Sequence, residues 1–137
     1  MLTFEVPGKI KGKQRPRFGK GKVYTQNHTV TYENWIRVCF VDAKHRNNLK
    51  VNMEIVPLRI KIVCTLSIPQ SYTKKKKLLI QEKKLLPTKA PDIDNVIKVV
   101  CDALNGVAYS DDRQIVECYC VKQYGEAEGL RIDIMEV

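Results

Sequence analysis

The stretch APDIDNVIKVVCDALNGVAYSDDRQI, residues 90–115, decides the fold of this chain. It holds five aspartates among largely apolar residues, whereas the whole 137-residue chain carries a net charge of +9. The apolar residues recur at helical spacing, which predicts a helix from about 93 to 104 that ends at Asn105-Gly106. The side chains expected to face inward are Ile93, Ile97, Val100 and Leu104.

Asp92 and Asp94 stand where this helix is expected to begin. At about 100° per residue, the two side chains would point to opposite sides if both were helical. They can share a ligand only if Asp92 is still extended where Asp94 opens the helix, and Pro91 favours that break. A purely structural explanation is also open, because either aspartate can cap the helix.

The remaining acids allow the same two explanations. Asp94, Lys98 and Asp102 follow at intervals of four residues along one polar flank, so Lys98 can be a surface lysine bonded to either acid. Asp111 and Asp112 can form a turn. That account leaves unexplained why two acidic pairs occur in a chain otherwise arranged to hold an anion. Carboxylates repel phosphate unless a divalent cation lies between them, so they indicate Mg²⁺ and phosphodiester chemistry.

Positive charge is gathered in two segments, 9–22 and 74–89, and 24 Lys and Arg stand against 15 acids. This segregation predicts a polyanionic partner, nucleic acid before membrane. Lys13, Arg15 and Arg17 recur at spacing two, so an extended backbone would aim all three the same way. The other candidates for contacts with a DNA backbone are Lys74, Lys75, Lys76 and Lys77, unless these form a solvated helix face.

Length and composition predict a single domain over residues 1–137 with its own core. No apolar run is long enough for a membrane span, and residues 1–14 lack the apolar run of a signal peptide, so we expect a cytoplasmic protein. The five cysteines are scattered and form no pair typical of a zinc site, so we expect reduced thiols and no zinc.

The other expected elements surround the acidic stretch. Residues 2–6 and 56–69 alternate as strands, with two short extended pieces around a turn at 19–21. Residues 29–46 read as a helix capped by Thr29 or Thr31 that places Trp35 in the core, and residues 71–87 as a helix stopped by Pro87. The last two strands, over about 113–124 and 130–137, are expected to form a hairpin.

The quoted stretch closely resembles the signature of the RusA family of Holliday junction resolvases. That signature is D-x-D-N, then a lysine, then D-A-L, then a short loop to D-D-x-Q-[IV], and each element occurs here in order. The early KGKQRPRFGKGKVYT also looks like the basic N-terminal segment of many phage members, so the similarity extends from about Val6 to Val121.

The resemblance implies residue roles and an assembly. Metal-binding acids would be Asp92, Asp94 and Asp112, and the catalytic lysine would be Lys98. Asn95, Asp102 and Asp111 would support these residues from behind without binding the metal themselves. The implied fold is an α/β (α+β) domain, a small mixed sheet with two to three helices, working as a homodimer.

The function implied is Mg²⁺-dependent cleavage of branched DNA, with Mn²⁺ as a possible substitute, in recombination and repair in the cytosol of a bacterial host. Lys98 would then stabilise the transition state or orient the attacking water. The homodimer also follows from the substrate, because resolving a four-way junction takes two symmetry-related cuts. Two rivals remain: a DNA-binding phage regulator that does not cut, and a nuclease for flaps, forks or RNA.

Overall fold

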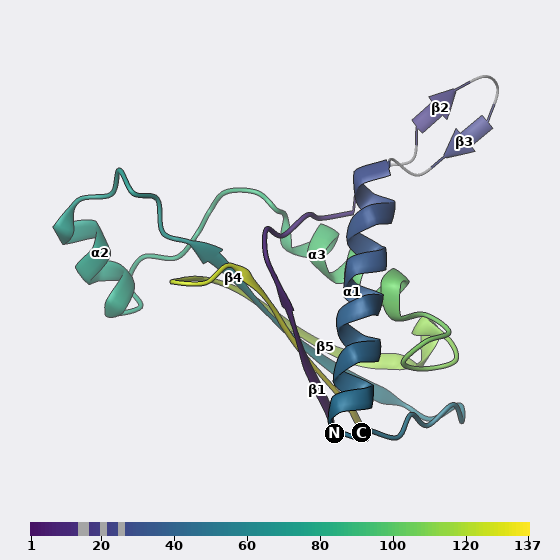
Figure 1. Cartoon of the computed structure of the whole chain (residues 1–137). Coiled ribbons are helices and arrows are strands. Elements are labelled where there is room, and N and C mark those ends of the chain that lie inside the picture. Colours follow the sequence, from purple (N-terminus) through teal and green to yellow (C-terminus); the bar gives the residue numbers. More distant parts are fainter. Residues whose placement is uncertain (14–16, 20–21, 25–26) are drawn as a thin grey trace.

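The computed structural model describes residues 1–13, 17–19, 22–24 and 27–137, with the backbone alone for 17–19, 22–24 and 27–28. The strands are β1 (Leu2–Pro7), β2 (Arg17–Gly19), β3 (Lys22–Tyr24), β4 (Leu58–Ser67), β5 (Ile115–Gly125) and β6 (Gly129–Glu136). The helices are α1 (Asn27–Arg46), α2 (Lys74–Gln81), α3 (Ile93–Leu104) and the short 3-10 helix η1 (Asp112–Gln114). The predicted α+β class, with a small mixed sheet, is confirmed (Figure 1).

The main sheet has four strands in the order β1-β6-β4-β5. β6 runs antiparallel to both of its neighbours, whereas β5 runs parallel to β4. The predicted hairpin of the last two strands is therefore wrong, because β4 lies between them. The connection between β5 and β6, residues 126–128, crosses the end of β4. At the start of β6, Gly129 approaches β1 so closely that a Cβ on it would lie 2.7 Å from the carbonyl oxygen of Val6. β4 and β6 are the two inner strands, and each pairs on both edges.

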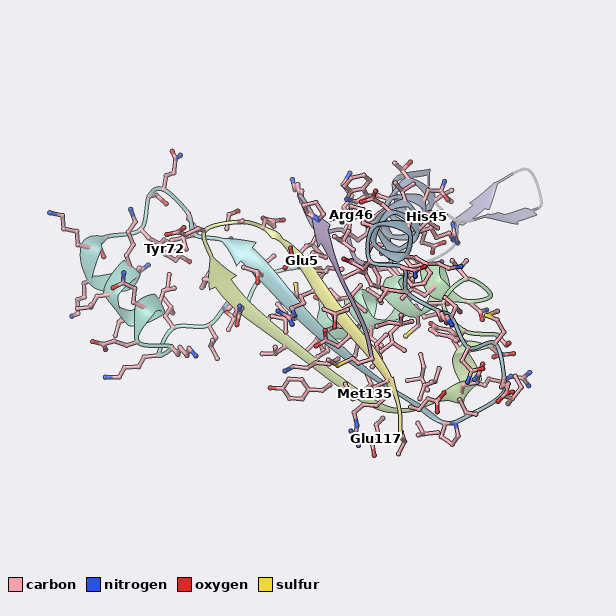
Figure 2. The ribbon with its side chains drawn as sticks, turned by 60° about the horizontal axis from the view of Figure 1, so that its bottom comes forward. Glu5, His45, Arg46, Tyr72, Glu117 and Met135 are labelled. Atoms are coloured by element: carbon pink, nitrogen blue, oxygen red, sulfur yellow. The ribbon has the colours of Figure 1, made fainter. Side chains whose placement is uncertain are left out.

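One face of the sheet carries the core. Along β4, Ile60, Ile62 and Cys64 are buried, and the alternate residues Arg59 and Lys61 are exposed. The helices α1 and α3 pack on the buried face and contact each other (Figure 2). Neither α1 nor α3 covers the opposite face of β4 and β5.

The helix α1 begins at Asn27, earlier than expected, so Thr29 and Thr31 lie inside it and neither is its cap. Its inward stripe is Ile36, Cys39, Phe40 and Ala43. Trp35 is not in the core: it is 40% exposed, and its indole N–H donates to the carbonyl of Pro7 at 2.8 Å. Trp35 lies about 100° around the helix from Ile36, at the edge of the buried stripe, and its polar N–H reaches a partner at the rim.

The helix α3 begins and ends where the sequence predicts. Its buried residues are Val96, Val99, Val100, Ala103 and Leu104. Of the four expected inward residues, Val100 and Leu104 are confirmed, Ile97 is partly buried and Ile93 is 42% exposed. The inward face is broader than one stripe because α3 packs against both the sheet and α1.

The helix α2 stands apart from the other helices, at the far end of the sheet (Figure 1). It has no buried residue and ends at Gln81, well before Pro87, so the predicted stop is wrong. The helix is about two turns long, and Lys83 shortly after it already has a positive φ of 59°.

The two short extended pieces, β2 and β3, pair antiparallel. Of the predicted turn at 19–21, residue 19 ends β2, and residues 20 and 21 lie outside the described residues. Within residues 1–13, 17–19, 22–24 and 27–137, no helix is long and apolar enough to cross a membrane.

Candidate active site

The first acidic pair lies at the start of α3. Asp92 is the N-cap, with an extended backbone (φ −69°, ψ 143°), and Asp94 lies in the first helical turn. The predicted change from extended to helical backbone between the two is confirmed. Both residues are exposed, and the Asp92 side chain makes no capping hydrogen bond. The pair therefore presents carboxylates to solvent at the positive end of the helix dipole.

Asp112 lies at the other end of α3. Its backbone N–H donates to the side-chain oxygen of Asn105, the C-cap, at 3.1 Å. The two caps, Asp92 and Asn105, are about 20 Å apart along the helix axis. Among the described residues, no three His, Cys, Asp or Glu side chains gather closely enough to hold a metal ion. Within one chain, the three acids that the resemblance assigns to metal binding therefore do not meet, because Asp92 and Asp94 lie at the start of α3 and Asp112 lies at its end.

The loop before β5 is fixed by Asp111 and Gln114. Asp111 caps η1 and accepts from the backbone and side chain of Arg113, which lowers the pKa of Asp111 to about 2. The buried Gln114 donates to the carbonyls of Glu54 and Val56, both at 3.0 Å. Asp111 thus positions the loop, and Asp112 beside it keeps a carboxylate with no ion pair among the described residues.

Lys98 and Asp102 continue the polar flank that Asp94 begins. The Lys98 ammonium lies 3.3 Å from Asp102, one turn further along α3. The lysine side chain is 62% exposed, so it retains donors directed at solvent. The spacing of four residues predicted such a surface ion pair as one alternative. The pair also holds the Lys98 ammonium one helical turn from Asp94.

Lys13 is directed inward, in contrast to the expected outward row of basic side chains. Its ammonium lies 2.6 Å from Glu33 and 3.2 Å from Asp102, and it joins α1 to α3. Burial alone would lower the pKa of Lys13, but the hydrogen bonds to the two acids outweigh it and raise that pKa above its ordinary value. Arg15 lies outside the described residues, as does the side chain of Arg17.

Three backbone N–H groups fix the segment 8–13, two through Glu128 in the β5–β6 connection and one through α3. The N–H groups of Gly8 and Ile10 donate to Glu128, and that of Lys13 donates to the carbonyl of Asn95 at 3.0 Å. A Cβ on Gly12 would lie 2.8 Å from the Asn95 Cβ, so only glycine fits this approach. Asn95 therefore supports the basic segment through its backbone carbonyl and its Cβ.

A groove runs beside Asp92 as a result. Lys9, Lys11 and Pro91 line it, and its volume is about 320 Å³. Both lysines are exposed. They are site residues that the sequence reasoning missed, although they continue the spacing of two on the N-terminal side of Lys13, with buried residues between.

The four lysines 74–77 form the first turn of α2 and are all exposed. Thr73 caps the helix by accepting from the N–H of Lys76 at 3.2 Å. They lie on a segment that the core does not position.

The fold and the site together define an α+β domain with an exposed acidic pair beside a lysine-lined groove. The sequence model of the family Endodeoxyribonuclease RusA matches residues 7–135, and the chain belongs to that family. It is thus an endodeoxyribonuclease, a hydrolase of a family that acts on branched DNA. The chain is also 32% identical to "Uncharacterized protein YqaN" of Bacillus subtilis (strain 168), over 99% of this chain and 96% of that protein.

Proposed function

We propose that the protein is a divalent-metal-dependent endonuclease that resolves four-way DNA junctions in recombination and repair in a bacterial cytosol. The observation that carries the proposal is the exposed pair Asp92 and Asp94 beside the groove of Lys9 and Lys11. Family membership supplies the reaction, and the groove supplies cationic side chains where a phosphate backbone would approach.

The donor set fits Mg²⁺ or Mn²⁺. Asp92 and Asp94 offer hard carboxylate oxygens, and Mg²⁺ in phosphoryl-transfer sites takes one or two carboxylates and keeps several waters. When bound, the cation would acidify a water and neutralise phosphate charge. Lys98, whose ammonium is largely exposed, would bind the same phosphate and either stabilise developing charge or orient the water.

The third carboxylate supports a homodimer. Asp112 lies about the length of α3 away from Asp92 in one chain, so it joins the same cation only if a second copy brings it there. A twofold axis that pairs the start of one α3 with the end of the other would make two equal sites. Two such sites suit the two cuts that resolution requires.

Cleavage assays test the proposal. A synthetic immobile four-way junction, a fork, a flap and a duplex are incubated with the protein in Mg²⁺. Resolution of the junction into two nicked duplexes is expected, with little cutting of duplex. Preferential cutting of flaps or forks would make the protein a nuclease of that kind, and binding without cutting of any DNA would make it a DNA-binding regulator.

A mixing experiment tests the shared site separately. Asp94→Asn and Asp112→Asn should each be inactive alone. Mixed and allowed to exchange subunits, they should regain nicking, because one site of each mixed dimer then has all its carboxylates. No regain of activity in mixed dimers, with exchange verified by differently tagged subunits, would place each site within one chain or exclude Asp112 from it.

A further inference from the structure

A second groove lies on the face of the sheet opposite α1 and α3. It runs between β4, β5 and residues 80–86, which comprise the end of α2 and the segment after it. Lys61 and Val63 contribute from β4, and they alternate with residues that face the core. The groove has a volume of about 610 Å³, close to twice that of the groove beside Asp92, and within the range of small-molecule sites.

Tyrosine rings with lysines over them mark this groove. Tyr119 is 57% exposed on β5, and the Lys61 ammonium lies 5.6 Å from its ring centroid. Tyr124 also lines the groove and has the Lys89 ammonium at 5.7 Å. Buried tyrosines fill cores, but a half-exposed ring with a cation beside it offers a stacking surface.

The groove extends into a strongly basic rim. Tyr124 meets Tyr72 edge to face, with the centroids 6.0 Å apart, and the Lys76 ammonium lies 4.7 Å from the Tyr72 ring. Figure 2 shows Tyr72 at the end of the sheet from which α2 projects. The four lysines of α2 repel one another and stand at the positive end of their own helix. A polyanion along this rim would offset both unfavourable terms.

The groove is connected to the acidic pair through the chain itself. Lys122 on the edge strand β5 donates to the carbonyl of Lys89. Lys89 is three residues before Asp92. A DNA strand that lies over Tyr119 and Tyr124 can therefore pass the edge of β5 and reach the start of α3. Lysine side chains would stay close to its phosphates along this path.

We propose that this groove binds an unpaired strand of DNA, with bases stacked on Tyr119 and Tyr124 and phosphates held by the surrounding lysines. Sequence-tolerant binding of single strands uses this combination of aromatic rings in a cationic groove. The choice of DNA rests on the proposed function. The groove itself is separate from the acidic pair, so the two can be tested apart.

Binding is measured by fluorescence anisotropy of a labelled oligothymidine of about 16 nucleotides, in EDTA so that no strand is cut. Tyr119→Ala should weaken binding at least about fivefold, because each stacked base contributes that much or more. Tyr119→Phe should bind like the wild type, and Lys61→Gln should flatten the salt dependence. The matched control is Val116→Ala, which removes an exposed side chain of the same strand outside the groove.

Equal affinity of Tyr119→Ala and the wild type, or an equal loss in Val116→Ala, would overturn the groove assignment. So would binding of polyglutamate with the same dependence on Tyr119, which would indicate an acidic protein as partner. If the wild type cuts junctions and the groove variants bind oligothymidine as tightly as the wild type, the proposed nuclease function stands and the groove assignment fails. If oligothymidine binding depends on Tyr119 but the protein cuts no DNA, the groove assignment stands and the proposed nuclease function fails.

Discussion

Two lysines two residues apart should have opposite roles. Lys13 holds α1 to α3, whereas Lys11 is exposed in the groove beside Asp92. We predict that Lys13→Met lowers the free energy of unfolding and that Lys11→Met weakens DNA binding. The pair separates a structural cation from a DNA-contacting one.

The magnitude follows from the contacts that are lost. Lys13→Met removes two charge-assisted hydrogen bonds, of about 1.5–3 kcal/mol each. The two acids keep other cations, Arg37 at 3.6 Å from Glu33 and Lys98 at 3.3 Å from Asp102. The net loss should therefore be about 2 kcal/mol, below the 3–5 kcal/mol of a fully uncompensated buried charge. For 137 residues this corresponds to a fall in Tm of about 7 °C.

Thermal unfolding and the salt dependence of junction binding are measured for both variants. Lys11→Met should change stability by less than about 0.5 kcal/mol and reduce the slope of log K against log salt by about 0.9. Lys13→Met should leave that slope nearly unchanged. An unchanged Tm together with a flattened slope in Lys13→Met would refute the reasoning, because the ammonium would then bind DNA and not the two acids.

The other predictions concern the acids and the close contacts. Asp92→Asn should abolish cleavage yet keep or strengthen junction binding, whereas Asp111→Asn, which alters only a cap, should still cut; wild-type rates for Asp92→Asn would exclude it as a ligand. Gly12→Ala should cost about 1–3 kcal/mol in a denaturant titration because it overlaps Asn95, and an unchanged midpoint would contradict the close approach. Burial alone would raise the pKa of Glu128, but accepted hydrogen bonds hold it below the ordinary 4.5. The stability difference between wild type and Glu128→Gln should thus be full above about pH 5 and fade as pH falls below 4.5; a difference independent of pH would argue against it.

Local periodicity was sufficient to predict α3 from Ile93 to Leu104 and the extended backbone at Asp92, because both depend on neighbouring residues alone. It failed for the hairpin, since the insertion of β4 between β5 and β6 depends on residues more than 50 positions away. The position of Trp35 also escaped, because a helical pattern gives a face only to within about one residue.

The roles of the charged residues were less predictable than the helices. The spacing of two residues grouped Lys13 with other basic residues as a DNA contact. Its ion pairs with two acids form only because α1 packs on α3, which the spacing does not reveal. The distance between Asp112 and Asp92 likewise depends on how the chain returns after α3, which no short pattern encodes. Lys9 and Lys11 continue the same spacing of two on the N-terminal side of Lys13, so the sequence pattern was sufficient to predict them.

The strand order β1-β6-β4-β5 alternates between the two halves of the chain, since β1 and β4 precede α2 and the other two follow it. Cutting the backbone within α2, which buries none of its residues, would therefore leave each fragment with strands that lie between or beside strands of the other. The two fragments should remain interlocked after a trypsin nick at Lys74–Lys77 and elute together. Expressed separately, they should reassemble by mutual complementation, with every strand pair of the main sheet formed between fragments.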